Sequence, residues 1–284
     1  MAAVDDQLDL ERRRAPVALI GACIAAVLPM AGGIAVASTI RDEPKSTPGR
    51  LIYIHDHSGK FVLYSILLGL GALALVFPLR YLYDATKARK PTLPRVALFC
   101  ALFGPVVYGI VQVGLQAVLV SKAATFADPA HGNQTYEEAK RVFDSGEVRV
   151  FQFLGLAGQL ALGFAFVMIC LNAMRVGLLT RFMGILGIIV GVLFVVPLAP
   201  GPPVVQSFWL AALAALFAGR WPTGIPPAWI TGRAVPWPSQ QALREQREGT
   251  LEPEPAPAAG APASAPASPR SASASRKRKR KKRR

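Results

Sequence analysis

Residues 96–120 read VALFCALFGPVVYGIVQVGLQAVLV, and these 25 residues contain no Asp, Glu, Lys or Arg. An α-helix rises about 1.5 Å per residue and the apolar core of a bilayer is about 30 Å thick, so this length is typical of a membrane-spanning helix. An open strand is disfavoured because the bilayer core has no water to hydrogen-bond its backbone. The stretch therefore predicts an integral membrane protein.

Apolar stretches of this kind recur along the chain, in which 52% of residues are hydrophobic and 17% are charged. This composition is typical of a membrane protein. The predicted spans are residues 16–38, 61–79, 96–120, 150–174, 182–198 and 204–219. We therefore predict an all-α fold, a polytopic transmembrane helical bundle of six spans.

The predicted spans divide the chain into four parts. They are residues 1–15, a cytoplasmic N-terminus; 16–219, the six-helix transmembrane domain; 220–252, a cytoplasmic Trp/Pro-rich juxtamembrane segment; and 253–284, a linker and polybasic tail. Residues 253–275 are mostly Pro, Ala, Ser and Gly and cannot bury enough apolar surface to fold, which predicts a disordered linker. In the juxtamembrane segment, Trp221, Trp229 and Trp237 favour either a docking strip for a partner or an aromatic belt at the membrane interface.

The distribution of basic residues predicts the orientation of the bundle. Only eight of the 32 Lys and Arg residues fall in the two loops that six spans would place opposite the termini. Lys and Arg are retained on the cytoplasmic side, so we expect both termini in the cytoplasm. The bias toward Ala, Gly, Arg and Pro is typical of a bacterium of high genomic GC content. The predicted location is therefore the bacterial inner membrane.

The start of the chain allows a second interpretation. The sequence ERRR at residues 11–14, the apolar run that follows and Ala35–Ala37 resemble the parts of a cleavable secretory signal. The apolar run is longer than the 7 to 15 residues of a typical signal core, which favours a retained first span. Cleavage would leave five spans.

The chain ends in nine consecutive basic residues. They are Arg276, Lys277, Arg278, Lys279, Arg280, Lys281, Lys282, Arg283 and Arg284. Such a run can bind anionic membrane lipid, at about 1 kcal/mol per residue, or ribosomal or other RNA through phosphate contacts. Basic C-terminal tails on membrane insertases resemble it. Retention of topology without a specific partner is the alternative interpretation of the tail.

Amide side chains are the main polar groups inside the predicted spans. Gln112 and Gln116 lie one turn apart, Gln152 and Gln159 lie two turns apart, and Asn172 is near the inner end of the fourth span. If these faces meet, they form a polar seam for a passive channel or carrier of a small neutral solute. Hydrogen bonding between helices, worth about 0.6 kcal/mol per contact, is the competing explanation.

The outer loops hold all three histidines of the chain. Residues 39–60 are predicted to be irregular and to end in a short extended segment, where His55 and His57 would point the same way and chelate a metal with His131. In the second loop, Thr135 and Glu138 form a capping box, which predicts a short helix.

The spans carry no Asp or Glu near their centres and no phosphate loop or nucleophile elbow. The first absence argues against an ion-coupled transporter and the second against an enzyme. We therefore predict a non-enzymatic protein without a cofactor, with membrane lipid as its first partner and a second copy of the chain as a further candidate. An enzyme that acts on lipid, with the outer His and Asp residues as its acid and base, is the open alternative.

Small residues predict close packing of the fourth and fifth spans. Gly155, Gly158 and Gly163 lie in the fourth, and Gly184, Gly187 and Gly191 lie in the fifth. Residues 171–198, LNAMRVGLLTRFMGILGIIVGVLFVVPL, resemble uncharacterised bacterial six-helix integral membrane proteins, a family without an assigned activity. The resemblance rests on the order of apolar segments, and it transfers no site residues.

Overall fold

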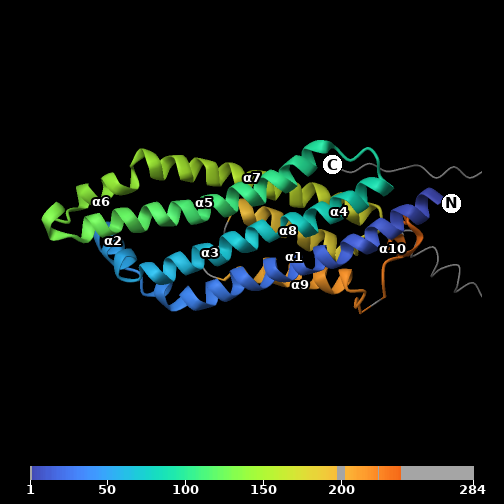
Figure 1. The fold of residues 1–284 in the computed structure, drawn as a ribbon, viewed down its shortest axis with the longest axis horizontal. Helices are drawn as coiled ribbons and strands as arrows, with labels where there is room; N and C mark the ends of the chain where they lie inside the picture. Colours follow the sequence, from blue (N-terminus) through green and yellow to red (C-terminus); the bar gives the residue numbers. More distant parts are fainter. Residues whose placement is uncertain (1, 197–201, 223, 238–284) are drawn as a thin grey trace, which may run out of the picture. The chain divides into compact units, whose positions relative to one another are not determined.

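The computed structural model describes residues 2–196, 202–222 and 224–237. Within these ranges all regular elements are helices, which confirms the all-α prediction. They are α1 Ala2–Arg41, α2 Thr47–Asp56, α3 Ser58–Ala74, α4 Val76–Arg89, α5 Arg95–Ala127, the 3-10 turn η1 Pro129–His131, α6 Tyr136–Phe143, α7 Gly146–Arg175, α8 Arg181–Val195, α9 Val204–Phe217 and α10 Pro227–Thr231 (Figure 1). The nine basic residues at 276–284 lie outside the described part of the chain.

Four helical segments are long and apolar enough to cross a membrane, so the chain is a multi-pass membrane protein. They are Val4–Arg41, Ser58–Arg89, Arg95–Ala127 and Gly146–Arg175. The second joins α3 and α4 with a break at Leu75. The fifth and sixth predicted spans correspond to α8 and α9, which have 15 and 14 residues. A perpendicular crossing needs about 20 residues, so these two helices are short.

The long helices and the short α8–α9 hairpin form a closed ring of neighbours. Around this ring α1 packs on α3, α3 on α5, α5 on α7, α7 on α8, and α9 on α1. The contact between α8 and α9 completes the ring, and it is the least extensive of the six helix–helix contacts. Helices α2 and α6 lie at one end of this bundle, and α4 and α10 lie near the other (Figure 1).

Close packing of α7 and α8, predicted from their glycines, is confirmed. A Cβ added to Gly163 would lie 2.7 Å from the carbonyl oxygen of Gly191, and one added to Gly191 would lie 2.9 Å from the carbonyl oxygen of Gly163. Real Cβ atoms do not approach an oxygen so closely. Only glycine at both positions allows the two backbones to touch.

The outer loops fold into short helices, and the prediction for the first loop is wrong. Residues 47–56 form α2 rather than an irregular segment. Pro48 is compatible with a first helical turn, and Leu51 and Ile54, one turn apart, are buried against α5 and the end of α1. The capping box of α6 is confirmed, since Thr135 Oγ1 accepts from the Glu138 N–H.

The backbone N–H of Thr135 in turn donates to the Glu138 carboxylate. This backbone hydrogen bond is the largest cause that holds the pKa of Glu138 below its ordinary value.

Candidate functional site

A cavity of about 460 Å³ lies within the ring of helices. Side chains from α1, α3, α5, α7, α8 and α9 line it, so all the helices of the ring contribute. It lies beside the thin α8–α9 contact. Among the described residues that line it, none is Asp, Glu, Lys, Arg, His or Cys. This lining offers no counter-charge to a charged molecule, and a buried charge without a partner is strongly disfavoured.

The positions of Gln112 and Gln159 along their helices give the depth of these two amides in the bundle. Gln112 lies 17 residues after Arg95, and Gln159 lies 16 residues before Arg175. At about 1.5 Å per residue, both amides are about 25 Å along their helices from the basic end. The apolar core of a bilayer is about 30 Å thick, so these two amides lie in the half that is farther from the basic end.

The polar wall of the cavity is centred on the hydroxyl of Tyr108. Gln112 Nε2 donates to this oxygen at 2.9 Å, and the Gln159 side chain interacts with the same hydroxyl. Gln116 lies one turn farther along α5 and lines the cavity as well. Three of the five predicted seam residues therefore meet around one cavity.

Two polar atoms in the cavity lining are buried without a hydrogen-bond partner among the described residues. They are Gln116 Nε2 on α5 and Ser207 Oγ on α9. Only 7% of Ser207 is exposed. An unsatisfied buried polar group costs about 1–3 kcal/mol. A molecule that hydrogen-bonded both atoms would remove this cost, and the free energy would favour its binding.

The opposite wall is apolar and held in place by aromatic contacts. The ring of Phe194 on α8 lies 6.1 Å from the Tyr108 ring and 5.4 Å from the Phe166 ring, between centroids. At the start of α9, Val204 and Val205 line the cavity and are also 58% and 40% exposed. These two residues therefore belong both to the cavity lining and to the exposed surface of the bundle.

The remaining two seam residues lie elsewhere. Gln152 is exposed near the start of α7 and does not line the cavity. Asn172 accepts from Lys90 Nζ at 2.8 Å and donates to the Met168 carbonyl at 2.7 Å. It thus joins α7 to the end of α4. Because Asn172 is 13 residues from Gln159, it is about 20 Å away along the same helix.

The geometry assumed for the histidine site is wrong. His55 lies in the last turn of α2 and His57 caps that helix, whereas the prediction placed both on an extended segment. Residues two apart on a helix do not face each other. No group of three or more His, Cys, Asp or Glu among the described residues is arranged to hold a metal ion, and the His131 side chain lies outside them. The structural reason for expecting His55, His57 and His131 to chelate together is therefore lost.

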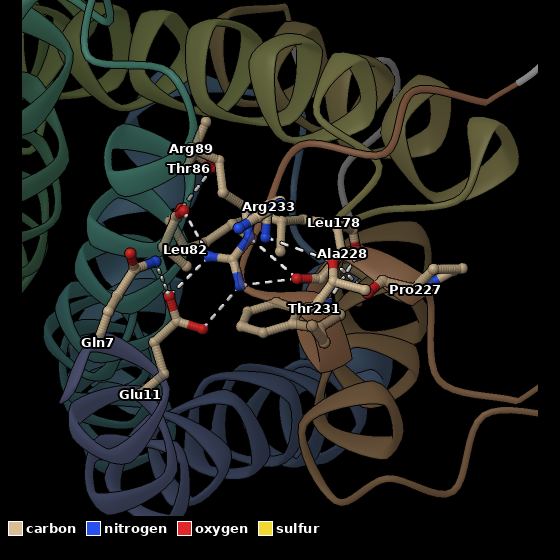
Figure 2. Close-up of polar contacts among 12 residues, drawn as sticks. Gln7, Glu11, Leu82, Thr86, Arg89, Leu178, Pro227, Ala228, Thr231 and Arg233 are labelled. Carbon is tan, nitrogen blue, oxygen red and sulfur yellow. Dashed lines mark hydrogen bonds and ion pairs between the residues drawn. The ribbon is translucent and has the colours of Figure 1, made fainter. Parts of the chain in front are cut away.

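A second polar cluster, which sequence analysis missed, lies around Arg89 at the end of α4 (Figure 2). The Arg89 side chain is fully buried, and it donates to both carboxylate oxygens of Glu11 at 2.6 and 2.9 Å. It also donates to the Ala85 carbonyl at 2.8 Å and twice to the Ala228 carbonyl, at 2.8 and 3.1 Å. These five bonds use all five guanidinium N–H groups. The cluster has no donor left for a ligand, so it ties α1, α4 and α10 together.

The tryptophans of residues 221–237 pack onto the chain itself. Trp229 Nε1 donates to the Leu178 carbonyl at 2.9 Å, and Trp237 Nε1 donates to the Leu179 carbonyl at 2.8 Å. The Trp229 ring also stacks on Tyr81, with centroids 5.5 Å apart. These hydrogen bonds hold the segment against the turn between α7 and α8. The docking-strip and aromatic-belt interpretations did not include these contacts within the chain.

Comparison with known proteins places the chain in a family. No curated protein and no solved structure matches the chain. Residues 19–225 match a family described as a domain of unknown function, DUF4386. This match begins within α1 and extends beyond the end of α9, so it includes all or part of every helix of the ring and every residue that lines the cavity. It agrees with the resemblance to an uncharacterised family. The chain belongs to the DUF4386 family of uncharacterised proteins.

Proposed function

We propose that this chain is a non-enzymatic integral membrane protein that binds a small uncharged molecule in the cavity and acts as a passive carrier for it. One observation supports this most strongly. Gln116 Nε2 on α5 and Ser207 Oγ on α9 are buried without a hydrogen-bond partner among the described residues. Both atoms belong to residues that line the same cavity of about 460 Å³. Pockets of about 300–1,000 Å³ with a few polar groups on an apolar wall are typical of small-molecule sites.

Binding rather than catalysis fits the composition of the wall. The described lining offers amides, hydroxyls and apolar groups, and it contains no His, Asp, Glu or Lys that could serve as a base for the Ser207 hydroxyl. A serine nucleophile needs an adjacent base to be activated. The proposed role is therefore to hold the molecule and release it unchanged.

The experiment measures equilibrium binding to the full chain in phosphatidylcholine nanodiscs, with empty nanodiscs as the blank. The probes are three uncharged molecules: glycerol, N-methylacetamide and 1-lauroylglycerol. We expect at least one to bind, and Gln116→Leu to weaken that binding about fivefold, the loss of one hydrogen bond of about 1 kcal/mol.

Gln152→Leu is the matched control. It makes the same substitution at an exposed amide outside the cavity and should leave binding unchanged. Binding of none of the probes, or equal effects of the two substitutions, would refute the proposed site. Passage is measured separately, as flux of the bound probe into sealed vesicles that carry the protein.

The proposed topology has six spans in the bacterial inner membrane, with α8 and α9 as the fifth and sixth and both termini in the cytoplasm. The first span is retained, because cleavage after Ala37 would remove Glu11 and leave Arg89 buried without its carboxylate. Green fluorescent protein folds only inside, so a fusion after Trp237 should fluoresce and one after Gly132 should not. Intact mass of the purified chain tests retention of the first span.

The basic tail supports a second candidate function. Nine adjacent cations on a Pro/Ala/Ser linker favour electrostatic contact with anionic lipid or with ribosomal or other RNA. We expect a chain ending at Ser275 to lose whatever the full chain captures from solubilised membranes, and capture to fall steeply with salt. Equal capture by both forms would leave the tail with a role in topology alone.

A further inference from the structure

We propose that the molecule bound in the cavity is an uncharged, single-chain amphiphile that enters from the outer half of the bilayer. This inference rests on the proposed function and names its ligand class. It follows from the distribution of polar and apolar side chains along the depth of the cavity, from the absence of charge in its described lining, and from its opening at the start of α9.

The polarity of the wall changes with depth. Helix α3 runs inward, and its lining begins with Tyr64 and Ser65 and ends ten residues later at Leu75. Helix α9 also runs inward; its lining begins with Val204 and Val205, continues with Gln206 and Ser207, and ends at Leu210. At about 1.5 Å per residue, the polar and apolar ends of the α3 lining are about 15 Å apart.

Helix α5 runs in the opposite direction, and its lining residues, Tyr108, Gln112 and Gln116, are all polar. Its lining runs outward from Tyr108 to Gln116, so its unpartnered amide lies at the outer end. Ala25 on α1 lies four residues inward of Pro29 and adds to the apolar inner end. The inner end of the lining is therefore apolar, since it is formed by Ala25, Ala72, Leu75 and Leu210, and the polar groups lie farther outward, which is the orientation of a lipid in the outer leaflet.

The head group of the ligand is constrained by the two unpartnered atoms. Gln116 Nε2 is a donor and requires an acceptor, and Ser207 Oγ can donate or accept. A hydroxyl, ester or amide head satisfies both. A carboxylate, phosphate or ammonium does not fit, because the described lining provides no counter-charge and an unpaired charge at this depth is strongly disfavoured.

The opening explains how a chain-bearing molecule would reach the site. Val204 and Val205 belong both to the lining and to the exposed surface, and they lie beside the thin α8–α9 contact. An amphiphile can therefore move sideways from lipid into the cavity without its apolar chain crossing water. A volume of about 460 Å³ has room for one chain rather than two.

The test compares two probes of equal chain length on the full protein in nanodiscs. One is 1-lauroylglycerol, which is uncharged, and the other is laurate at pH 8, which is anionic. We expect laurate to bind at least tenfold more weakly than 1-lauroylglycerol. Equal binding of the two would overturn the proposed ligand class.

Substitutions test the orientation of the bound molecule. Gln116→Leu combined with Ser207→Ala should weaken 1-lauroylglycerol binding about thirtyfold, from the loss of two hydrogen bonds of about 1 kcal/mol each. Ala72→Leu, which fills the apolar end, should also abolish it while sparing glycerol. Unchanged binding in both variants would refute the proposed placement of the head group and the chain. The comparison of 1-lauroylglycerol with laurate uses the wild-type protein, so it remains valid even if a variant fails to fold.

The outcomes separate this inference from the proposed function. Binding of glycerol or N-methylacetamide without 1-lauroylglycerol would overturn the amphiphile and leave the proposed function standing. Binding of no uncharged probe would overturn both.

Discussion

Removing the carboxylate of Glu11 should destabilise the bundle by about 3 kcal/mol, because breaking a buried ion pair leaves an unpaired charge that costs about 3–5 kcal/mol. The Arg89 side chain is 0% exposed and that of Glu11 is 11% exposed, so water cannot easily replace the lost partner. The lower end of the range applies because Arg89 keeps its bonds to the carbonyls of Ala85 and Ala228. A loss of about 3 kcal/mol lowers the ratio of folded to unfolded protein about 150-fold.

The assay is reversible unfolding of the Glu11→Ala variant by SDS in mixed micelles. Tryptophan emission is a suitable signal, since the Arg89 guanidinium lies 5.5 Å from the Trp229 ring. Asp9→Ala is the matched control on the same helix, because Asp9 and Arg12 are 3.9 Å apart with side chains 66% and 78% exposed. Exposed pairs contribute about 0–1 kcal/mol, so the control should change little.

A double variant separates the ion pair from simple loss of packing. Arg89→Met with Glu11→Leu removes both charges and should recover most of the stability that Glu11→Ala loses. If the free energies of unfolding of the Glu11→Ala and Asp9→Ala variants differ by less than about 1 kcal/mol, water reaches Arg89 and the reasoning from burial is wrong.

Three further predictions concern other parts of the fold. Gly191→Ala should destabilise the protein by about 1–3 kcal/mol in the same assay, because its Cβ would lie 2.9 Å from a backbone oxygen of α7, whereas Gly146→Ala, with no atom within 4 Å, should be neutral or stabilising. The hydrogen bond from Thr135 lowers the pKa of Glu138, so its contribution to α6 is present above pH 4.5 and is lost as the pH falls through the lower pKa of the folded state. Hydrogen exchange of the α6 amides, corrected for intrinsic rates, should show protection falling in acid, and unchanged protection would contradict the capping argument. Trp237→Phe should remove one hydrogen bond worth about 1 kcal/mol and increase proteolysis after α10, with unaltered cleavage as the contrary result.

Length and apolarity are local properties, and they were sufficient to predict the long helices. The run at residues 96–120 lies inside α5, and the small residues of α7 and α8 correctly predicted their close contact. The failure at residues 47–56 has the opposite cause. Pro48 and Gly49 suggested a loop, but the burial of Leu51 and Ile54 against other helices stabilises α2.

The candidate site could be predicted only in part. Gln112, Gln116 and Gln159 stood out because amides are rare in apolar runs, and all three line the cavity. Ser207 gave no such signal, since serine is common in apolar helices. Glu11 and Arg89 are 78 residues apart, and no local pattern reveals that such charges pair.

The position of α1 in the ring has a consequence for how the protein is made. The first helix to leave the ribosome packs on α3 and α4 and also on α9, which ends at Phe217. One side of α1 therefore has no protein neighbour until about 200 residues have been synthesised, and until then lipid must cover it. The cavity is completed in the same late step, since Ser207 lies on α9. Chain elongation thus determines when binding becomes possible, and nascent chains halted before residue 204 have an open ring.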